Sequence, residues 1–282
     1  MRQRDSLLRQ QKIKRVALPV EQIRSAAYGS FGEKKIIRDV PYVPTPQWVV
    51  REMLTLASVG PGDIVYDPGC GDGRIIVTAA KEFGAHGVGI DIDPDRIAES
   101  KKNADIASVW DRTQFHQMSL FDVDFRPATV VTLYLLPWAN ARLRPKFLAE
   151  LRPGSRIVGH SFGMQNWLPD RTINLPYEER TIRRWIVPAN VAGRWSCTLR
   201  VPNGRLKHGL LELEQEFQTI VGQIVIDGEA LPLQRIALQG PRLVFQIKGA
   251  DYICHVDADS IHGASKCREH PTWTMELRAR RM

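Results

Sequence analysis

Cysteine is scarce in this 282-residue chain, and long apolar runs are absent. None of the four cysteines belongs to a C-x-x-C pair, so neither a zinc site nor a redox dithiol is indicated. No stretch reaches the roughly 20 apolar residues that span a bilayer. Residues 1–15 are polar and basic, without the apolar core of a secretory signal. We therefore expect a cytoplasmic protein with reduced thiols, no metal and no membrane span.

Acidic residues are also few at the start of the chain. Of the net charge of +8, most comes from residues 1–40, which hold ten Lys or Arg and only four Asp or Glu. The remaining body is close to neutral and makes no electrostatic case for nucleic acid. We expect this basic arm to be a solvated tail, although a clamp for an acidic partner or a weak RNA-binding segment fits the same composition.

The rest of the chain has two patterns. From 41 to 190, short apolar strands alternate with helical segments, which predicts an α/β domain with a mostly parallel, doubly wound sheet. From 191 to 282, short alternating runs are separated by Gly, Pro and Asp. This pattern predicts an antiparallel β-rich subdomain, packed as a small sandwich or partial barrel. The expected organisation is an arm at 1–40, the α/β domain at 41–190 and the β subdomain at 191–282.

Some expected elements are specific enough to be tested. Thr45 is predicted to cap the first helix, with Pro46 as its first residue. A long loop is predicted at 163–177, of the kind that forms lids or surface excursions. In the last stretch the run at 231–238 predicts one strand, and Asp227-Gly228 predicts a hairpin turn.

A glycine-rich loop at 67–73 (DPGCGDG) follows the first predicted strand and precedes a helix. Glycine there lets the backbone approach a ligand that a Cβ would keep away. A dinucleotide motif needs a third glycine at position 74, where this chain has Arg74. The carboxylates of Asp67 and Asp72 would repel a pyrophosphate and attract a cation. The loop therefore favours S-adenosylmethionine, whose methionine part carries an ammonium and a sulfonium. Asp91, at the end of the next strand, is placed to accept hydrogen bonds from its ribose.

These residues resemble the class I S-adenosylmethionine-dependent methyltransferases. Within that class, the segments 41–46 (PYVPTP), 67–74 and 134–137 (YLLP) resemble a bacterial group. That group is related to the mitochondrial protein-lysine methyltransferases that act on a subunit of ATP synthase and on the adenine nucleotide translocase. The resemblance covers about residues 41–160 and implies a Rossmann-like core.

The resemblance also implies a set of cofactor-binding residues. Asp67, Gly69 and Gly71 would hold the methionine part, and Asp91 the ribose. Ser119 occupies the position where the family usually has an acidic residue that contacts the adenine amino group. That contact is expected to be weaker, or to pass to the backbone or to Asp122. The predicted cofactor-binding set is Asp67, Gly69, Cys70, Gly71, Asp91, Ile92, Ser119 and Leu120.

The segment after the fourth predicted strand would lie over the methyl donor. Adenine-N6 and glutamine methyltransferases have Asn or Asp before Pro-Pro here, whereas this chain has Leu135 and Leu136, so those acceptors are disfavoured. Tyr134 and Tyr42 are the predicted catalytic residues. With Trp138 they would line an aromatic channel that lowers the pKa of a lysine by desolvation. Simple packing under the sheet end is the alternative.

His160, at the end of the fifth predicted strand, is a candidate general base, although a hydrogen-bonded structural histidine is the favoured interpretation. Taken together, the sequence predicts an S-adenosylmethionine-dependent methyltransferase, with protein-lysine N-methylation favoured. The alternatives are a small-molecule N- or O-methyltransferase, an RNA methyltransferase anchored by the basic arm, and a non-catalytic cofactor-binding protein. A dinucleotide oxidoreductase is a remote further alternative.

Overall fold

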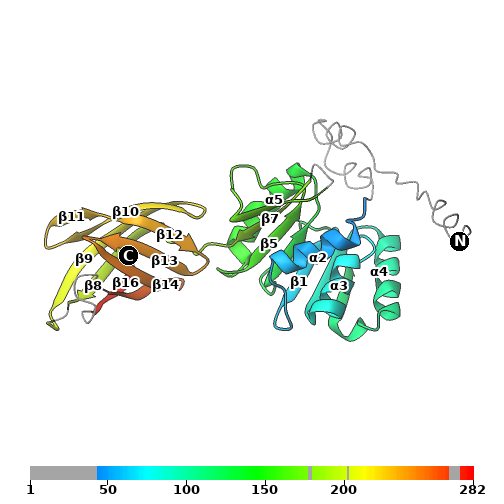
Figure 1. The fold of residues 1–282 in the computed structure, drawn as a ribbon, viewed down its shortest axis with the longest axis horizontal. Coiled ribbons are helices and arrows are strands. Elements are labelled where there is room, and N and C mark those ends of the chain that lie inside the picture. Colours follow the sequence, from blue (N-terminus) through cyan, green and yellow to red (C-terminus); the bar gives the residue numbers. More distant parts are fainter. Residues whose placement is uncertain (1–42, 177–179, 202, 267–273) are drawn as a thin grey trace, which may run out of the picture. The chain divides into compact units, whose positions relative to one another are not determined.

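The computed structural model describes residues 43–176, 180–201, 203–266 and 274–282, which form two β-sheets and several helices (Figure 1). The predicted basic arm and Tyr42 lie outside the described residues. No helix in the described part of the chain is long and apolar enough to cross a membrane. The helices are α2 Gln47–Leu56, α3 Arg74–Phe83, α4 Pro94–Ile106 and α5 Pro137–Glu150, with a 3-10 turn η1 Trp110–Arg112.

The first sheet has seven strands in the order β3-β2-β1-β4-β5-β7-β6. Strands β1 to β5 are parallel, and β7 runs antiparallel to both of its neighbours. The strand order reverses between β1 and β4, and ligands of open parallel sheets bind beyond the carboxyl ends of the strands at such a switch point. The strands are β1 Ile64–Pro68, β2 His86–Asp91, β3 Thr113–Gln117, β4 Val130–Leu133, β5 Arg156–His160, β6 Arg171–Asn174 and β7 Thr181–Ile186.

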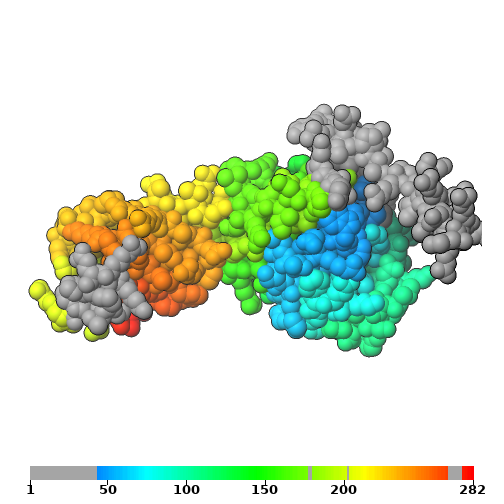
Figure 2. Space-filling model, in the orientation of Figure 1, coloured from blue at the N-terminus to red at the C-terminus, as the bar shows by residue number. Residues whose placement is uncertain are grey.

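Helices cover both faces of this sheet. Successive residues of its central strands point to opposite faces, and both sets are buried. Val130 belongs to one core with α2, α3 and α4, whereas Val131 belongs to a second core with α5. Each fully buried aliphatic side chain of this kind contributes about 1.5–3 kcal/mol relative to an exposed one. The helices α2, α3 and α4 lie side by side, coloured blue to green in the space-filling view (Figure 2). The predicted mostly parallel, doubly wound α/β core is thus confirmed.

Two local predictions about this part of the chain were wrong. The first helix begins one residue later than expected, because Pro46 is itself the residue before the helix, in an extended conformation, and its carbonyl accepts the Val50 N–H. Thr45 therefore does not cap the helix. The segment predicted as a loop at 163–177 contains strand β6, and Met164 and Trp167 anchor it in the core, although most of its other described residues are exposed.

The second sheet is antiparallel and has nine strands in the order β11-β10-β9-β8-β16-β15-β14-β13-β12. The predicted turn at Asp227-Gly228 is confirmed, with φ of 52° and 82° between β10 and β11. The single strand predicted at 231–238 is instead parts of two strands: β11 ends at Pro232, which has no N–H for a longer ladder. The strands are β8 Gly193–Arg200, β9 Leu206–Glu216, β10 Thr219–Ile226, β11 Glu229–Pro232, β12 Gln234–Gln239, β13 Arg242–Ile247, β14 Ala250–Val256, β15 Ser260–Lys266 and β16 Thr274–Arg281.

Candidate functional site

The glycine-rich loop lies at the switch point, between the end of β1 and the start of α3. The backbone N–H groups of Gly69 and Cys70 both donate to the Ile90 carbonyl, at 2.7 and 2.9 Å, which ties the loop to the end of β2. Gly69 has a φ of +83°, and a Cβ there would lie 2.9 Å from Cδ2 of Leu135. Gly71 also has a positive φ, of 54°. These conformations favour glycine and leave a backbone cradle that a ligand can approach.

Asp67 is more deeply buried than Asp72, the other carboxyl group of this loop. It is 3% exposed and accepts a 2.7 Å hydrogen bond from the Thr132 hydroxyl on the neighbouring strand β4. Burial raises its pKa to about 7, the Thr132 hydrogen bond opposes that shift, and the charges of Asp91 and Asp72 add to it. A carboxylate in such surroundings is stabilised by a cationic ligand, because a nearby opposite charge favours the ionised form.

Asp91 links the end of β2 to the same loop. One carboxylate oxygen accepts the Gly71 N–H at 2.9 Å, and the other accepts the Asp93 N–H at 3.0 Å. Each carboxylate oxygen has a further lone pair, so the group is held in place and can still accept from a ligand hydroxyl. Ile92, the next residue, is 40% exposed beside it. The structure therefore places Asp91 and Ile92 together at the edge of the loop.

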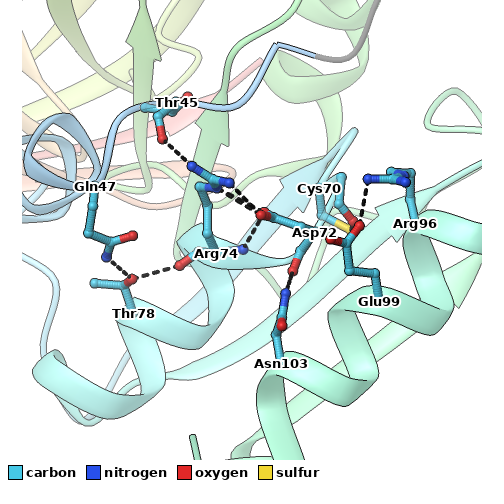
Figure 3. A network of polar contacts seen from close by, with 10 residues as sticks. Thr45, Gln47, Cys70, Asp72, Arg74, Thr78, Arg96, Glu99 and Asn103 are labelled. Atoms are coloured by element: carbon cyan, nitrogen blue, oxygen red, sulfur yellow. Dashed lines mark hydrogen bonds and ion pairs between the residues drawn. The ribbon is translucent and has the colours of Figure 1, made fainter. Parts of the chain in front are cut away.

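The second carboxylate of the loop, Asp72, has a different role from the one predicted (Figure 3). Its two carboxylate oxygens share the Nε–H of Arg74, at 2.9 and 3.0 Å, and its backbone carbonyl accepts from Asn103 of α4 at 2.9 Å. Arg74 also donates to the Thr45 carbonyl at 3.1 Å. This ion pair compensates the charge of Asp72 and fastens the loop to its surroundings. The attraction for a cation thus rests on Asp67 and Asp91.

Cys70 contributes to the packing of the loop more than to a ligand surface. Its side chain is buried, and its Sγ lies 2.9 Å from the place that a Cβ on Gly89 would take. Burial raises the pKa of the thiol, so it stays protonated. The Cys70 carbonyl accepts the Gly73 N–H at 2.9 Å, and its own N–H bonds to Ile90. The backbone N–H and carbonyl of Cys70 are thus engaged within the loop, which leaves them less available for the predicted contact with the cofactor.

The segment that carries Ser119 and Leu120 lies next to Asp91, since the Met118 N–H donates to the Asp91 carbonyl at 3.0 Å. The Ser119 hydroxyl accepts the N–H of Phe121 at 3.2 Å and so closes its own turn. Both residues are half-buried. The segment predicted to contact the adenine is thereby brought to the same edge of the sheet as Asp91, the carboxylate predicted to contact the ribose, which is the arrangement that one adenosyl group requires.

A cluster of rings lies where β4 and β5 end. Tyr134 stacks on His160 with ring centroids 4.3 Å apart and on Phe162 at 6.3 Å. The Tyr134 hydroxyl accepts a 3.3 Å hydrogen bond from Nη1 of Arg180. Trp138 lies apart from these rings and contacts Phe121, with centroids 6.0 Å apart. The structure thus places Tyr134 in an aromatic cluster, whereas the predicted partner Tyr42 lies outside the described residues.

His160 does not fit either of its predicted roles. It is fully buried, and neither ring nitrogen has a hydrogen-bond partner among the described residues, so it is not the hydrogen-bonded structural histidine that the sequence favoured. Burial, with a smaller contribution from the Arg180 charge, lowers its pKa to about 4. An imidazole with that pKa is too weak a base to deprotonate an ammonium group at neutral pH.

Sequence reasoning missed two residues of this site. Thr132 is a polar residue at a buried strand position two residues before Tyr134, and that pattern was the available signal for its bond to Asp67. Arg180 had no comparable signal, because only the antiparallel pairing of β7 with β5 brings it to Tyr134. Within the described residues, no group of three or more His, Cys, Asp or Glu side chains is arranged to hold a metal ion.

These features fit an adenosyl cofactor with a cationic end. The buried Asp67 needs a positive partner, the positive φ of Gly69 and Gly71 leaves backbone open to the ligand, and Asp91 has lone pairs available for hydroxyl groups. A pyrophosphate would instead meet two carboxylates that lie close enough to raise the pKa of one of them.

Known proteins agree with this geometry. The family model of the ANTKMT methyltransferase domain matches residues 67–171. A protein-lysine N-methyltransferase of Saccharolobus islandicus is 48% identical over 137 residues, which are 48% of this chain and 85% of that protein. A lysine N-methyltransferase of Xenopus laevis, named for a subunit of ATP synthase, is 34% identical over 131 residues, 46% of this chain and 57% of that protein.

Among solved structures, the RNA methyltransferase from Salinibacter ruber in complex with S-adenosyl-L-homocysteine is 50% identical, with a TM-score of 0.51. The match covers 53% of this chain and 96% of that one. Each of these three matches thus covers about half of the present chain. The predicted recognition, enzyme class and cofactor are confirmed: the chain belongs to the family of S-adenosylmethionine-dependent methyltransferases that the ANTKMT methyltransferase domain describes.

Proposed function

We propose that this chain transfers the methyl group of S-adenosylmethionine to the ε-amino group of a lysine in a protein. The observation that supports this most directly is the aromatic cluster around Tyr134, at the edge of the sheet next to the glycine loop. The residues after Tyr134 are Leu135 and Leu136, which offer no side-chain acceptor for an amide or adenine amino group. The names of the relatives from Saccharolobus and Xenopus point to the same acceptor.

In this proposal, each residue of the site holds one part of the reactants. Asp67 binds the ammonium of the cofactor's methionine part, the backbone at Gly69 and Gly71 lies against it, and Asp91 accepts from the ribose hydroxyls. Ser119 and Leu120 border the adenine, with Ile92 on its exposed side. When bound, S-adenosylmethionine supplies a methyl group activated by a sulfonium.

The acceptor half of the reaction depends on Tyr134. Its ring, with those of His160 and Phe162, forms an apolar surface that excludes water from the incoming amine. Desolvation lowers the pKa of a lysine and so favours the neutral nucleophile. The Tyr134 hydroxyl can accept an N–H of that amine and aim its lone pair. Alignment of two reactants in this way is worth on the order of 7–11 kcal/mol of the barrier.

The pKa of Asp67 gives a pH dependence that can be measured. A cationic ligand needs the ionised carboxylate, so below pH 7 the free protein must lose a proton before it binds. Calorimetry with S-adenosylhomocysteine, which keeps the ammonium, should show a dissociation constant that rises about tenfold per pH unit below pH 7 and levels off above it.

Variants of Thr132 test whether the pKa of Asp67 sets the pH midpoint below which binding weakens. The Thr132 hydrogen bond opposes the rise in the Asp67 pKa, so Thr132→Val should move the midpoint to higher pH. Thr132→Ser keeps the hydroxyl and serves as the matched control, with the midpoint of the wild type. A binding curve that is flat between pH 5 and 9 (a range of about two units either side of the pKa) would contradict the assigned role of Asp67.

The acceptor class can be established with labelled S-adenosylmethionine. Cell-extract fractions incubated with the enzyme should acquire label that is sensitive to protease and resistant to ribonuclease, and mass spectrometry should locate methyl groups on lysine. The Asp67→Asn variant is the control for background labelling. Label found on small molecules would refute the proposed lysine acceptor.

A second candidate is RNA methylation. It is favoured by the likeness to the Salinibacter RNA methyltransferase, at 50% identity, and by the basic composition of residues 1–40. The same labelling experiment separates the two, because this function predicts label that ribonuclease releases and protease does not. Removal of residues 1–40 should then reduce that labelling, since phosphate contacts by Lys and Arg supply much of the affinity for RNA.

A further inference from the structure

Arg180 directly precedes strand β7, which begins at Thr181. Strand β7 runs antiparallel to β5, so its first residues lie at the edge where β5 ends. The pairing is close, because the Ser161 N–H donates to the Thr181 carbonyl at 2.7 Å. Nη1 of Arg180 thereby lies 3.3 Å from the hydroxyl of Tyr134. Tyr134 follows β4, which is the neighbour of β5 on the side opposite to β7.

The charge of Arg180 already acts on a titratable group in this cluster. His160 is stacked on the Tyr134 ring, and its pKa is lowered to about 4 by burial first and by the Arg180 charge second. At neutral pH the imidazole is therefore uncharged. A basic group that arrives beside Tyr134 enters the same surroundings and experiences the same two effects.

We propose that Arg180 is a specificity-determining residue that keeps the acceptor amine of the bound substrate uncharged and therefore nucleophilic. This rests on the proposed transfer to an amine. A free lysine has a pKa of about 10.4, so only a small fraction is neutral at physiological pH. A fixed positive charge near the amine disfavours its ammonium form, and each pKa unit of that effect is a tenfold gain in the neutral fraction.

The hydrogen bond from Arg180 also has a geometric consequence. It fixes the direction of the Tyr134 hydroxyl, whose oxygen carries two lone pairs with which to accept. Arg180 thus acts on the acceptor both by its charge and through the orientation of the hydroxyl. The two effects can be separated, because glutamine keeps an N–H donor without the charge and lysine keeps the charge.

Other charged groups near this edge must be controlled. His160 on β5 stays neutral above pH 4, and Arg183 on β7, which donates to the Ser161 carbonyl, remains charged. Asp67 on β1 titrates near pH 7. A comparison of two ligands that both carry the methionine ammonium cancels the effect of Asp67.

Sinefungin and S-adenosylhomocysteine are such a pair. Sinefungin carries an amine-bearing carbon in place of the methylated sulfur, so its extra amine lies on the acceptor side. The ratio of their two dissociation constants therefore reports the free-energy cost of placing an ammonium at that position. It is measured by calorimetry from pH 7 to 10, a window around the ordinary amine pKa.

We expect Arg180→Met and Arg180→Gln to tighten sinefungin relative to S-adenosylhomocysteine about tenfold at pH 7, with the gain fading as the pH rises. Arg180→Lys should keep the wild-type ratio. A ratio that stays at the wild-type value in either the Met or the Gln variant overturns the proposal. Equal weakening of both ligands indicates a purely structural role and also overturns it. Label on RNA instead of lysine would refute the proposed function and leave these ratios as they are.

Discussion

Replacement of Asp67 by asparagine should reduce the affinity for S-adenosylhomocysteine by a factor on the order of 10²–10⁴. The variant keeps the size of the side chain and an oxygen that can accept the Thr132 hydroxyl, but it removes the negative charge. Loss of one partner of a buried ion pair costs about 3–5 kcal/mol, which corresponds to that factor. Calorimetry at pH 8, where the wild-type carboxylate is ionised, gives the comparison directly.

The matched control is Asp72→Asn on the same loop. Asp72 is paired with Arg74, so its loss should change the affinity far less than the loss of Asp67 does. Equal effects of the two variants would mean that the cation is held by the whole acidic loop and not by Asp67. An unchanged affinity in Asp67→Asn would refute the assignment altogether.

The same variant should affect stability in the opposite direction. The folded-state pKa of Asp67 is about 7, above the ordinary value of 3.8, so the folded protein binds the proton more tightly than the unfolded chain. Its contribution to the free energy of unfolding is thus lost as the pH rises from about 4 to about 7. Asp67→Asn removes this pH-dependent loss, so at pH 8 the ligand-free variant should be at least as stable as the wild type to urea.

Replacement of Gly73 by alanine should lower the free energy of unfolding by about 2–5 kcal/mol. Gly73 precedes helix α3 with a φ of +75°, a conformation that an alanine adopts only with strain. Its Cβ would also lie 2.6 Å from Cβ of Ser100 and 2.8 Å from Cε1 of Phe115, both fixed in the core. The strain and the overpacking add, because neither can be relieved without moving the loop or α4.

Urea unfolding measures this effect, and Gly60→Ala provides the control. A Cβ on Gly60 has nothing within 4 Å, and its φ lies outside the positive region, so that substitution should change stability by no more than about 0.5 kcal/mol. If the two variants unfold at the same urea concentration, the tight contact at Gly73 is not part of the folded protein in solution.

The sequence was informative about the cofactor loop because the loop is local. Its glycines need positive φ within a few residues of one another. Asp67 is the next-to-last residue of β1 and Asp91 the last of β2, so spacing alone brings them to one edge of a parallel sheet. The antiparallel strands of the second sheet were predictable from alternation, and the hairpin at Asp227-Gly228 from turn chemistry. Both depend on contacts between near neighbours in the chain.

The errors were of a different kind. Whether Asp72 faces a ligand or Arg74 is decided by side-chain torsions that no periodicity encodes. The run at 231–238 is mostly apolar, yet Pro232 and the pairing partners on β10 and β13 divide it between two strands. The segment at 163–177 resembles a loop in composition, but the long-range burial of Trp167 anchors it to the core and part of it forms β6.

The sequence by itself determined the donor half of this protein, because the cofactor cradle is made of backbone conformations and strand-end carboxylates that short motifs specify. Only the tertiary structure decided the acceptor half. Tyr134 follows β4, His160 ends β5 and Arg180 precedes β7, and the three meet only because β7 turns back antiparallel beside β5. The charge state of Asp67 was likewise decided by burial, a property of the packed molecule that a linear pattern does not contain.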